Sequence, residues 1–177
     1  MQSGSSRILK EMNRRYDKEK YLSLVEKIRA AVPDISLTTD IIVGFPGETE
    51  EDFRETLDVV EKADFDTAFT FIYSKRSGTP AAKMENQVPE DVVKDRFDRL
   101  LALVQEKGRK VSSRFEGTVQ EVLVETESKE KGIFTGRTQY NLLVHFPASP
   151  ELLGKYVNVR LDTCKGFYYL GSLQDEN

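Results

Sequence analysis

The chain has 177 residues, of which 38% are hydrophobic, 10% aromatic and 32% charged, and its formal net charge is −4. This composition is typical of a folded globular protein with one ordinary domain or two small ones, and it excludes a disordered chain. The slightly acidic balance excludes nucleic-acid binding through overall charge, so a basic site has to be local. Because no run of roughly 20 apolar residues and no apolar signal core occur, we expect a cytoplasmic protein that makes no membrane contact.

Residues 1–116 alternate between helical and strand-like periods, which is the pattern of an α/β unit. Asp17 is the expected N-cap of a helix that Pro33 ends, and Thr49 with three following acids is expected to begin another. Between these helices, residues 35–43 read ISLTTDIIV. This β-branched run predicts a parallel strand that is buried on both faces.

The rest of this half is predicted to hold a second buried strand over residues 66–73, a loop over 74–88 and a long helix in which Gly108 is a kink or an end. After Gly117 the helical period disappears. Glycines and prolines then separate short strand-like runs at the spacing of a small antiparallel barrel. These runs are residues 118–125, 133–137, 142–146, 156–161 and 167–170. We therefore expect two domains, 1–116 and 117–177.

Two parallel strands with three helices cannot close a sheet, so the α/β half is expected to expose an apolar strand edge. This indicates the carboxyl-terminal fragment of a longer α/β protein followed by one β-barrel. A complete two-layer α/β domain is the alternative. Under the fragment hypothesis, the edge at residues 35–43 is expected to drive self-association.

Four sequence blocks carry a resemblance to a known family. Glycines 44 and 47 allow backbone to approach a ligand at the carboxyl end of a parallel strand, where open α/β sheets bind their ligands. Together with the other blocks, this segment closely resembles the radical S-adenosylmethionine methylthiotransferases. The blocks are residues 2–5, 12–16, 39–49 and 71–81, in the order and spacing of that family.

The resemblance implies the last part of a radical-SAM partial β/α barrel, followed by a TRAM domain, which is a small antiparallel barrel of OB-like type. It is closest to the branch that methylthiolates C2 of N6-isopentenyladenosine beside the tRNA anticodon. In such enzymes a [4Fe–4S] cluster reduces S-adenosylmethionine to a radical that abstracts hydrogen from the substrate, and the barrel positions that cofactor. The anticodon stem-loop of tRNA and the missing portions of the same protein are the implied partners.

The resemblance also implies cofactor-binding residues. Gln2 and Arg14 match residues that contact the ribose and carboxylate of S-adenosylmethionine, and Asp40 matches an acceptor for ribose hydroxyls. An ordinary alternative makes Arg14 a solvated helix-end residue and Asp40 a cap for the following loop. The remaining residues match the adenine side of the site, with ordinary alternatives as turn and core residues: Ile42, Gly44, Phe71 and Tyr73.

One departure from the family pattern concerns iron. Two [4Fe–4S] clusters are implied, each held by three cysteines, whereas the chain contains only Cys164. The single histidine, His145, adds too few ligands for a zinc site, and no internal disulfide can form. We therefore expect this fragment to be catalytically inactive by itself and to bind no cofactor tightly.

Residues 136–146 resemble the TRAM signature G-R-T-x-x-N-x-x-V-x-F. In that family the domain grips tRNA, which implies a phosphate contact from Arg137, hydrogen bonds from Thr138 and Asn141, and stacking by Tyr140. A local basic face is expected from Lys129, Lys131, Lys155, Arg160 and Lys165, whose ordinary alternative is solvation.

Two alternatives to this function stay open. A sibling methylthiotransferase acting on threonylcarbamoyl-adenosine or on an aspartate of a ribosomal protein would share the same barrel. A non-catalytic RNA-binding module would explain the missing cysteines directly.

Overall fold

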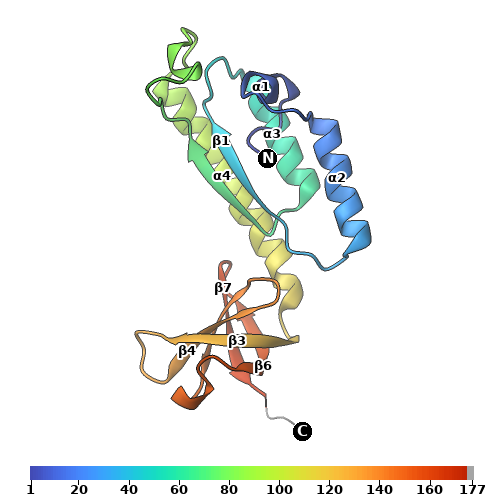
Figure 1. The fold of residues 1–177 in the computed structure, drawn as a ribbon, viewed down its shortest axis with the longest axis vertical. Coiled ribbons are helices and arrows are strands. Elements are labelled where there is room, and N and C mark those ends of the chain that lie inside the picture. The colour runs from blue at the N-terminus through green and yellow to red at the C-terminus, as the bar shows by residue number, and fades with distance from the viewer. Residues whose placement is uncertain (175–177) are drawn as a thin grey trace. The chain divides into compact units, whose positions relative to one another are not determined.

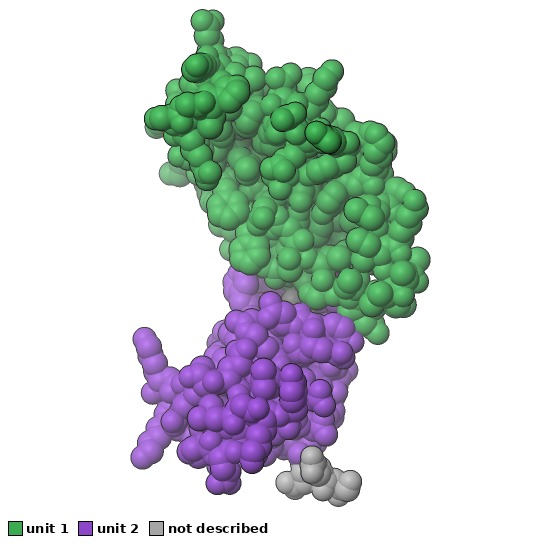
Figure 2. Space-filling model, viewed as in Figure 1, with its two compact units in different colours: residues 1–108 green, residues 109–177 purple. Residues whose placement is uncertain are grey.

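The computed structural model describes residues 1–174, apart from the side chain of Ser112. The chain forms two compact units, Met1–Gly108 and Arg109–Asn177, coloured green and purple in Figure 2. The sequence-based domain boundary between residues 116 and 117 stays a prediction, because compactness alone does not define a domain. Each unit is described by itself below.

The first unit is an α/β structure, as predicted. Its two strands, β1 (Thr38–Val43) and β2 (Thr67–Ile72), pair in parallel to form a two-stranded sheet. The helices in chain order are α1 (Ser6–Glu11), α2 (Lys18–Ala31), α3 (Glu50–Ala63), the short 3-10 turn η1 (Ala81–Lys83) and α4 (Glu90–Ser112), which Figure 1 shows with the strands. Among the described residues, no helix is long and apolar enough to cross a membrane.

Local signals explain where these elements begin. Asp17 accepts a hydrogen bond from the backbone of Lys20 at 2.8 Å, and Thr49 forms a reciprocal capping box with Asp52 at the start of α3. The predicted strand over residues 35–43 begins only at Thr38. The amide of Leu37 donates to a carboxylate oxygen of Asp66 at 2.8 Å, so a side chain takes the place of a strand partner there.

One face of the sheet is buried and the other is open. Ile41 and Val43 of β1 are fully buried with Phe53 of α3 and Leu100 of α4. The prediction that both strands are buried on both faces was wrong, because Asp40 of β1 is exposed and Phe69 and Phe71 of β2 are about half exposed, at 55% and 52%. In the described part of the chain, helices cover only one side of these two strands.

The second unit is a closed five-stranded barrel with the order β3-β4-β5-β7-β6. Its elements are β3 (Val119–Glu127), β4 (Ile133–Thr138), β5 (Leu143–Pro147), β6 (Tyr156–Cys164) and β7 (Tyr168–Leu173), with short 3-10 turns η2 (Ser113–Phe115) and η3 (Pro150–Leu152). Four ladders are antiparallel, as predicted, whereas β5 and β7 pair in parallel. Directions cannot alternate all the way round a closed ring with an odd number of strands, so one parallel pair is unavoidable.

The barrel interior is filled with aliphatic and aromatic side chains. Phe134, Val144, Val159 and Leu161 are fully buried there, and Tyr169 is 2% exposed. Gly136 is required for this packing, because a Cβ at that position would lie 2.5 Å from the carbonyl oxygen of Leu123. The barrel therefore has its own core and closes its own sheet.

Candidate functional site

The open face of the two-stranded sheet gathers three of the residues predicted to bind the cofactor. Asp40 stands opposite Phe69 and Ile42 opposite Phe71 in the parallel register. Alternate residues of a strand share a face, so a carboxylate, an aliphatic side chain and two aromatic rings lie together. Asp40 and both rings are exposed, and Ile42 is half-buried. Sequence reasoning missed Phe69, although its period-two spacing from Phe71 was a usable signal.

Gln2 lies beside β1, and Arg14 follows α1, where its amide donates to the carbonyl oxygen of Leu9 at 2.8 Å. The carbonyl oxygen of Gln2 accepts a hydrogen bond from the amide of Ile42 at 2.9 Å, and its side-chain oxygen accepts from the Tyr16 hydroxyl at 2.9 Å. Arg14 is exposed.

The loop that carries Gln2 is held against α3 by buried polar contacts. A Cβ on Gly4 would lie 2.4 Å from the carbonyl oxygen of Glu55. The hydroxyl of Ser5 donates to Asp52 at 2.6 Å, and Arg7 forms an ion pair with the same carboxylate. Burial alone would raise the pKa of Asp52, but the hydrogen bonds from Arg7, Ser5 and Thr49 outweigh it and lower the pKa to about 2.

Helix α4 packs closely against residues 44–47, the glycine loop that follows β1. Gly44 has a φ of +78°, and a Cβ there would lie 2.6 Å from Cγ2 of Val93 in α4. Gly47 also has a positive φ, and its amide donates to the carbonyl oxygen of Asn86 at 2.7 Å. Only glycine combines this backbone conformation with such close approach. These contacts thus fix the conformation of the loop at the carboxyl end of the sheet.

A buried ion pair fixes the end of this loop. Glu48 and Arg96 are 6% and 5% exposed, and Nη1 of Arg96 lies 3.0 Å from both Oε1 and the backbone oxygen of Glu48. The same carboxylate accepts from the amide of Gly44 at 3.1 Å. Burial raises the pKa of Glu48, while the Gly44 amide and Arg96 oppose the rise. Sequence reasoning missed Arg96, although an arginine inside the apolar stripe of Val93 and Leu100 was a signal for a buried charge.

Tyr73 connects the second strand to the loop. Its amide donates to the carbonyl oxygen of Val43 at 2.8 Å, and its ring meets Phe45 edge-on with centroids 5.4 Å apart. Tyr73 is half-buried, and Phe71 lies two residues earlier on the open face. These two side chains therefore flank the carboxyl ends of both strands, where open α/β sheets bind ligands.

The signature residues of the barrel support one tight turn. The Thr138 hydroxyl is buried and accepts hydrogen bonds from the amides of Tyr140 and Leu142, at 3.2 and 3.3 Å. Asn141 has a φ of +61°, and its side-chain oxygen accepts from Arg137 at 3.0 Å. These contacts give Thr138 and Asn141 local structural roles, and their contacts to RNA stay predictions.

Arg137 and Tyr140 are accessible to different degrees. The Arg137 guanidinium also forms an ion pair with Glu125 at 3.2 Å and remains 42% exposed. The Tyr140 ring stacks on Phe115 with centroids 4.9 Å apart, so one of its faces is already covered. Arg137 is thus the signature side chain best placed for a phosphate.

Exposed cations and aromatic rings occur together elsewhere on the barrel. Tyr156 and Phe167 are 65% and 78% exposed, and Lys155 and Lys165 are close neighbours of them in the chain. The other members of the predicted basic face, Lys129, Lys131 and Arg160, are also exposed. Aromatic faces for stacking beside cations for phosphate are the usual elements of single-stranded RNA sites.

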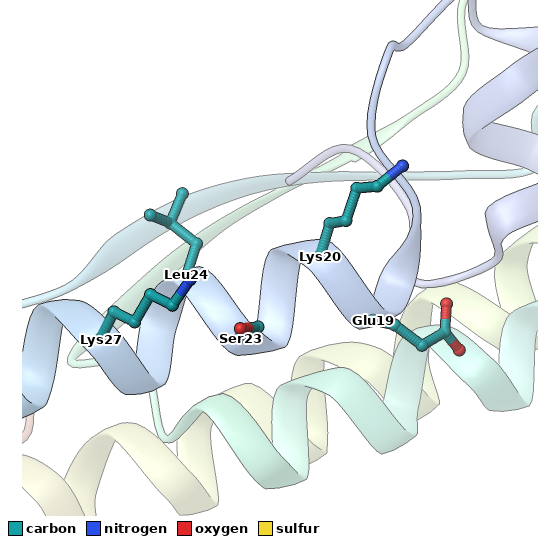
Figure 3. Close-up of a pocket in the computed structure, with 5 residues that line it drawn as sticks. All are labelled: Glu19, Lys20, Ser23, Leu24 and Lys27. Carbon is teal, nitrogen blue, oxygen red and sulfur yellow. The ribbon is translucent and has the colours of Figure 1, made fainter.

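A shallow hollow on α2 does not coincide with these residues. Its lining comes from one helix face, drawn in Figure 3: Glu19, Lys20, Ser23, Leu24 and Lys27. None of the residues predicted to bind cofactor or RNA takes part. Among the described residues, no group of three or more His, Cys, Asp or Glu side chains is arranged to hold a metal ion.

Two family models match the chain. Residues 1–60 match the radical SAM superfamily, and residues 113–173 match the TRAM domain. In structure, the chain is similar to coproporphyrinogen III oxidase from Escherichia coli, a radical SAM enzyme, with a TM-score of 0.52 and 16% identity. That similarity covers 90% of this chain and 39% of the oxidase, and it concerns the fold alone.

Sequence relatives cover both units. The chain is 57% identical over 177 residues to the tRNA-2-methylthio-N(6)-dimethylallyladenosine synthase of Lachnoclostridium phytofermentans, covering 99% of this chain and 39% of the relative. It is 59% identical over 173 residues to the synthase of the same name from Acetivibrio thermocellus, covering 97% of this chain and 36% of the relative. The chain thus spans less than two fifths of the length of these curated relatives.

Proposed function

Because the chain belongs to the tRNA methylthiotransferases of the radical SAM superfamily, we propose that it forms the carboxyl-terminal part of a synthase that methylthiolates C2 of N6-isopentenyladenosine (dimethylallyladenosine) in tRNA. The observation that carries this proposal is the 57% identity that runs through both units to a relative named for that reaction. Modification of tRNA would place the enzyme in the cytoplasm.

The open face of the sheet fits S-adenosylmethionine. Asp40 would accept hydrogen bonds from ribose hydroxyls, and Arg14 with Gln2 would bind the carboxylate and ribose. Ile42, Gly44, Phe71 and Tyr73 would enclose the adenine. When bound, S-adenosylmethionine supplies the radical chemistry and the methyl group. The residues of this chain would bind and orient the cofactor from the carboxyl ends of the strands.

The chain does not fit an iron–sulfur cluster. Its one cysteine, Cys164, belongs to the barrel, and a cluster of this class needs three thiolates. In the proposed enzyme, the cluster ligands belong to the three fifths of the relatives' length that this chain does not span.

We propose that the barrel binds the anticodon stem-loop. Arg137 would pair with phosphate, and Tyr140, Asn141 and Thr138 would complete or support that contact. The exposed lysines and rings of the same unit would extend it.

An assay of tRNA nucleosides tests the proposal. A fusion of this chain to the part of a relative that it does not span should convert N6-isopentenyladenosine to its 2-methylthio derivative, as measured by mass spectrometry. Asp40→Asn should raise the apparent KM for S-adenosylmethionine about tenfold, whereas Asp98→Asn, an exposed acid on α4, should leave it unchanged.

Each other outcome points to a different alternative. Product only from threonylcarbamoyl-adenosine or from a ribosomal-protein aspartate would overturn the proposed substrate branch. Binding of tRNA with no binding of S-adenosylmethionine would favour a non-catalytic RNA module.

A further inference from the structure

Two cations stand without partners just beyond the end of β2. Lys75 and Arg76 are exposed, and within residues 1–174 neither side chain forms a hydrogen bond or an ion pair. Most other arginines of this unit are engaged. Arg7, Arg96 and Arg99, for example, each bind a carboxylate. Lys75 and Arg76 therefore carry positive charge that the fold does not neutralise.

The loop that presents these cations is ordered by its own hydrogen bonds. The carbonyl oxygen of Arg76 accepts from the amide and the hydroxyl of Thr79, at 3.2 and 2.8 Å. Gly78 has a φ of +84° within this turn. The Gln87 side-chain amide donates to the backbone of Ala81 at 3.2 Å and of Met84 at 2.8 Å. An ordered loop presents its charges with little loss of conformational entropy on binding.

The position of the loop relates these cations to the cofactor face. Ile72 is paired with Val43, and the amide of Tyr73 donates to the same Val43. Lys75 therefore lies three residues beyond the end of β2, at the carboxyl end of the face that carries Asp40, Ile42 and Phe71. A base that reacts over that face brings the phosphates of its own strand to the same edge.

We propose that Lys75 and Arg76 bind backbone phosphates of the single-stranded RNA loop that carries the target base. This inference rests on the proposed function and adds an RNA contact on the α/β unit. Arginine pairs with a phosphate through two parallel donors, and lysine supplies a point charge on a flexible stem. Exposed Phe69 on the adjacent face provides apolar surface for an unstacked base.

A salt titration of RNA binding tests this contact. Anticodon stem-loop RNA is bound to the 177-residue chain, and the affinity is measured by fluorescence anisotropy between about 50 and 200 mM salt. Lys75→Gln with Arg76→Gln should weaken binding on the order of tenfold at 0.1 M salt and reduce the slope of log K against log salt by about 1.4, for two lost phosphate contacts.

The matched control removes two cations from helices. Lys27→Gln with Lys94→Gln changes net charge equally, and neither side chain has a hydrogen-bond or ion-pair partner in the described residues. It should leave both affinity and slope within twofold of the unaltered chain. Equal effects of the two double variants, or no salt-dependent RNA binding by the unaltered chain, would overturn the inference. Equal competition by polyglutamate would do so too, because it would indicate an acidic protein partner.

Failure of the inference is distinguishable from failure of the proposed function. If the complete enzyme forms the methylthiolated nucleoside and the Lys75/Arg76 double variant has an unchanged KM for tRNA, only the inference fails. If no variant forms product from any tRNA, the proposed function fails.

Discussion

The two units treat their motif residues in opposite ways. In the barrel, every strand has two neighbours, and signature side chains such as Thr138 and Tyr140 bind other parts of the same unit. In the α/β unit, Asp40 and Phe71 face outward from a sheet of two strands. The packing that supports these strands lies on the opposite, buried face of the sheet. Motif residues can thus either stabilise a turn of the fold or form a surface for a ligand. The contacts that their side chains make within the protein distinguish these two roles.

The largest expected effect tests whether the barrel is stable by itself. Phe134→Ala should cost about 3 to 5 kcal/mol, because it leaves a cavity among fully buried side chains. Hydrogen exchange of the whole chain should report the loss in barrel peptides alone. Phe167→Ala, which alters an exposed ring in the same unit, is the control and should cost less than about 0.5 kcal/mol. An equal loss of hydrogen-exchange protection in the α/β peptides would contradict the independent stability of the barrel.

Next in size is the buried ion pair behind the glycine loop. Arg96→Met should destabilise the α/β unit by about 3 kcal/mol, because Glu48 is left buried without its cation. Since burial already raises the pKa of Glu48 above its ordinary 4.5, the variant should regain stability as the pH falls through that raised pKa, and the gain should be complete below about pH 4.5, where the acid is neutral in the folded and the unfolded chain. Denaturant unfolding at several pH values measures both effects.

A surface arginine on the same helix is the control for that variant. Arg99→Met removes ion pairs to Glu50 and Asp95 from a side chain that is 39% exposed, so it should cost less than about 1 kcal/mol. Glu48→Gln added to Arg96→Met should restore part of the loss. Equal costs for the two arginine variants would mean that the loop is not held by Arg96.

A smaller effect depends on acid. The pKa of Asp52 is lowered from 3.8 to about 2, so the stability that it contributes is complete above pH 3.8 and disappears as the pH falls toward 2. After allowance for screening, this amounts to about 1 to 2 kcal/mol. Asp52→Asn should flatten the fall in unfolding free energy between pH 4 and pH 2. A fall of unchanged steepness would assign the acid sensitivity to other carboxylates.

The smallest expected change in stability concerns the barrel surface. Arg137→Ala breaks an exposed ion pair with Glu125, which contributes about 0 to 1 kcal/mol. Its effect on RNA should be larger, with severalfold weaker binding of tRNA and a shallower salt dependence. Arg14→Ala should leave RNA affinity unchanged, because we assign that side chain to the cofactor. Equal losses in both variants would place the RNA surface elsewhere.

Much of the fold could be predicted because its signals are local. The N-caps Asp17 and Thr49 and the strands of the barrel depend on residues a few positions apart. The partnership of Glu48 with Arg96 joins residues 48 positions apart, so no local pattern indicates it. The exposure of Phe71 was missed for a related reason, since an apolar strand reads alike whether one face or both are covered.

The candidate site could be predicted by residue identity more readily than by geometry. Asp40, Ile42 and Phe71 were chosen from a resemblance, and the parallel register places them on one face. The buried state of Thr138 could not be predicted, because it depends on how the turn to Leu142 folds back over its hydroxyl.

The odd number of barrel strands has a consequence for synthesis. When β3 to β6 have left the ribosome, β5 and β6 each still present an unpaired edge, and both edges are open to other chains. Strand β7 pairs with β6 across an adjacent hairpin and with β5, from which η3 and β6 separate it in the chain, so its arrival closes both edges in one step. The nascent barrel is therefore most vulnerable to misassembly in the interval before residues 168–173 are made.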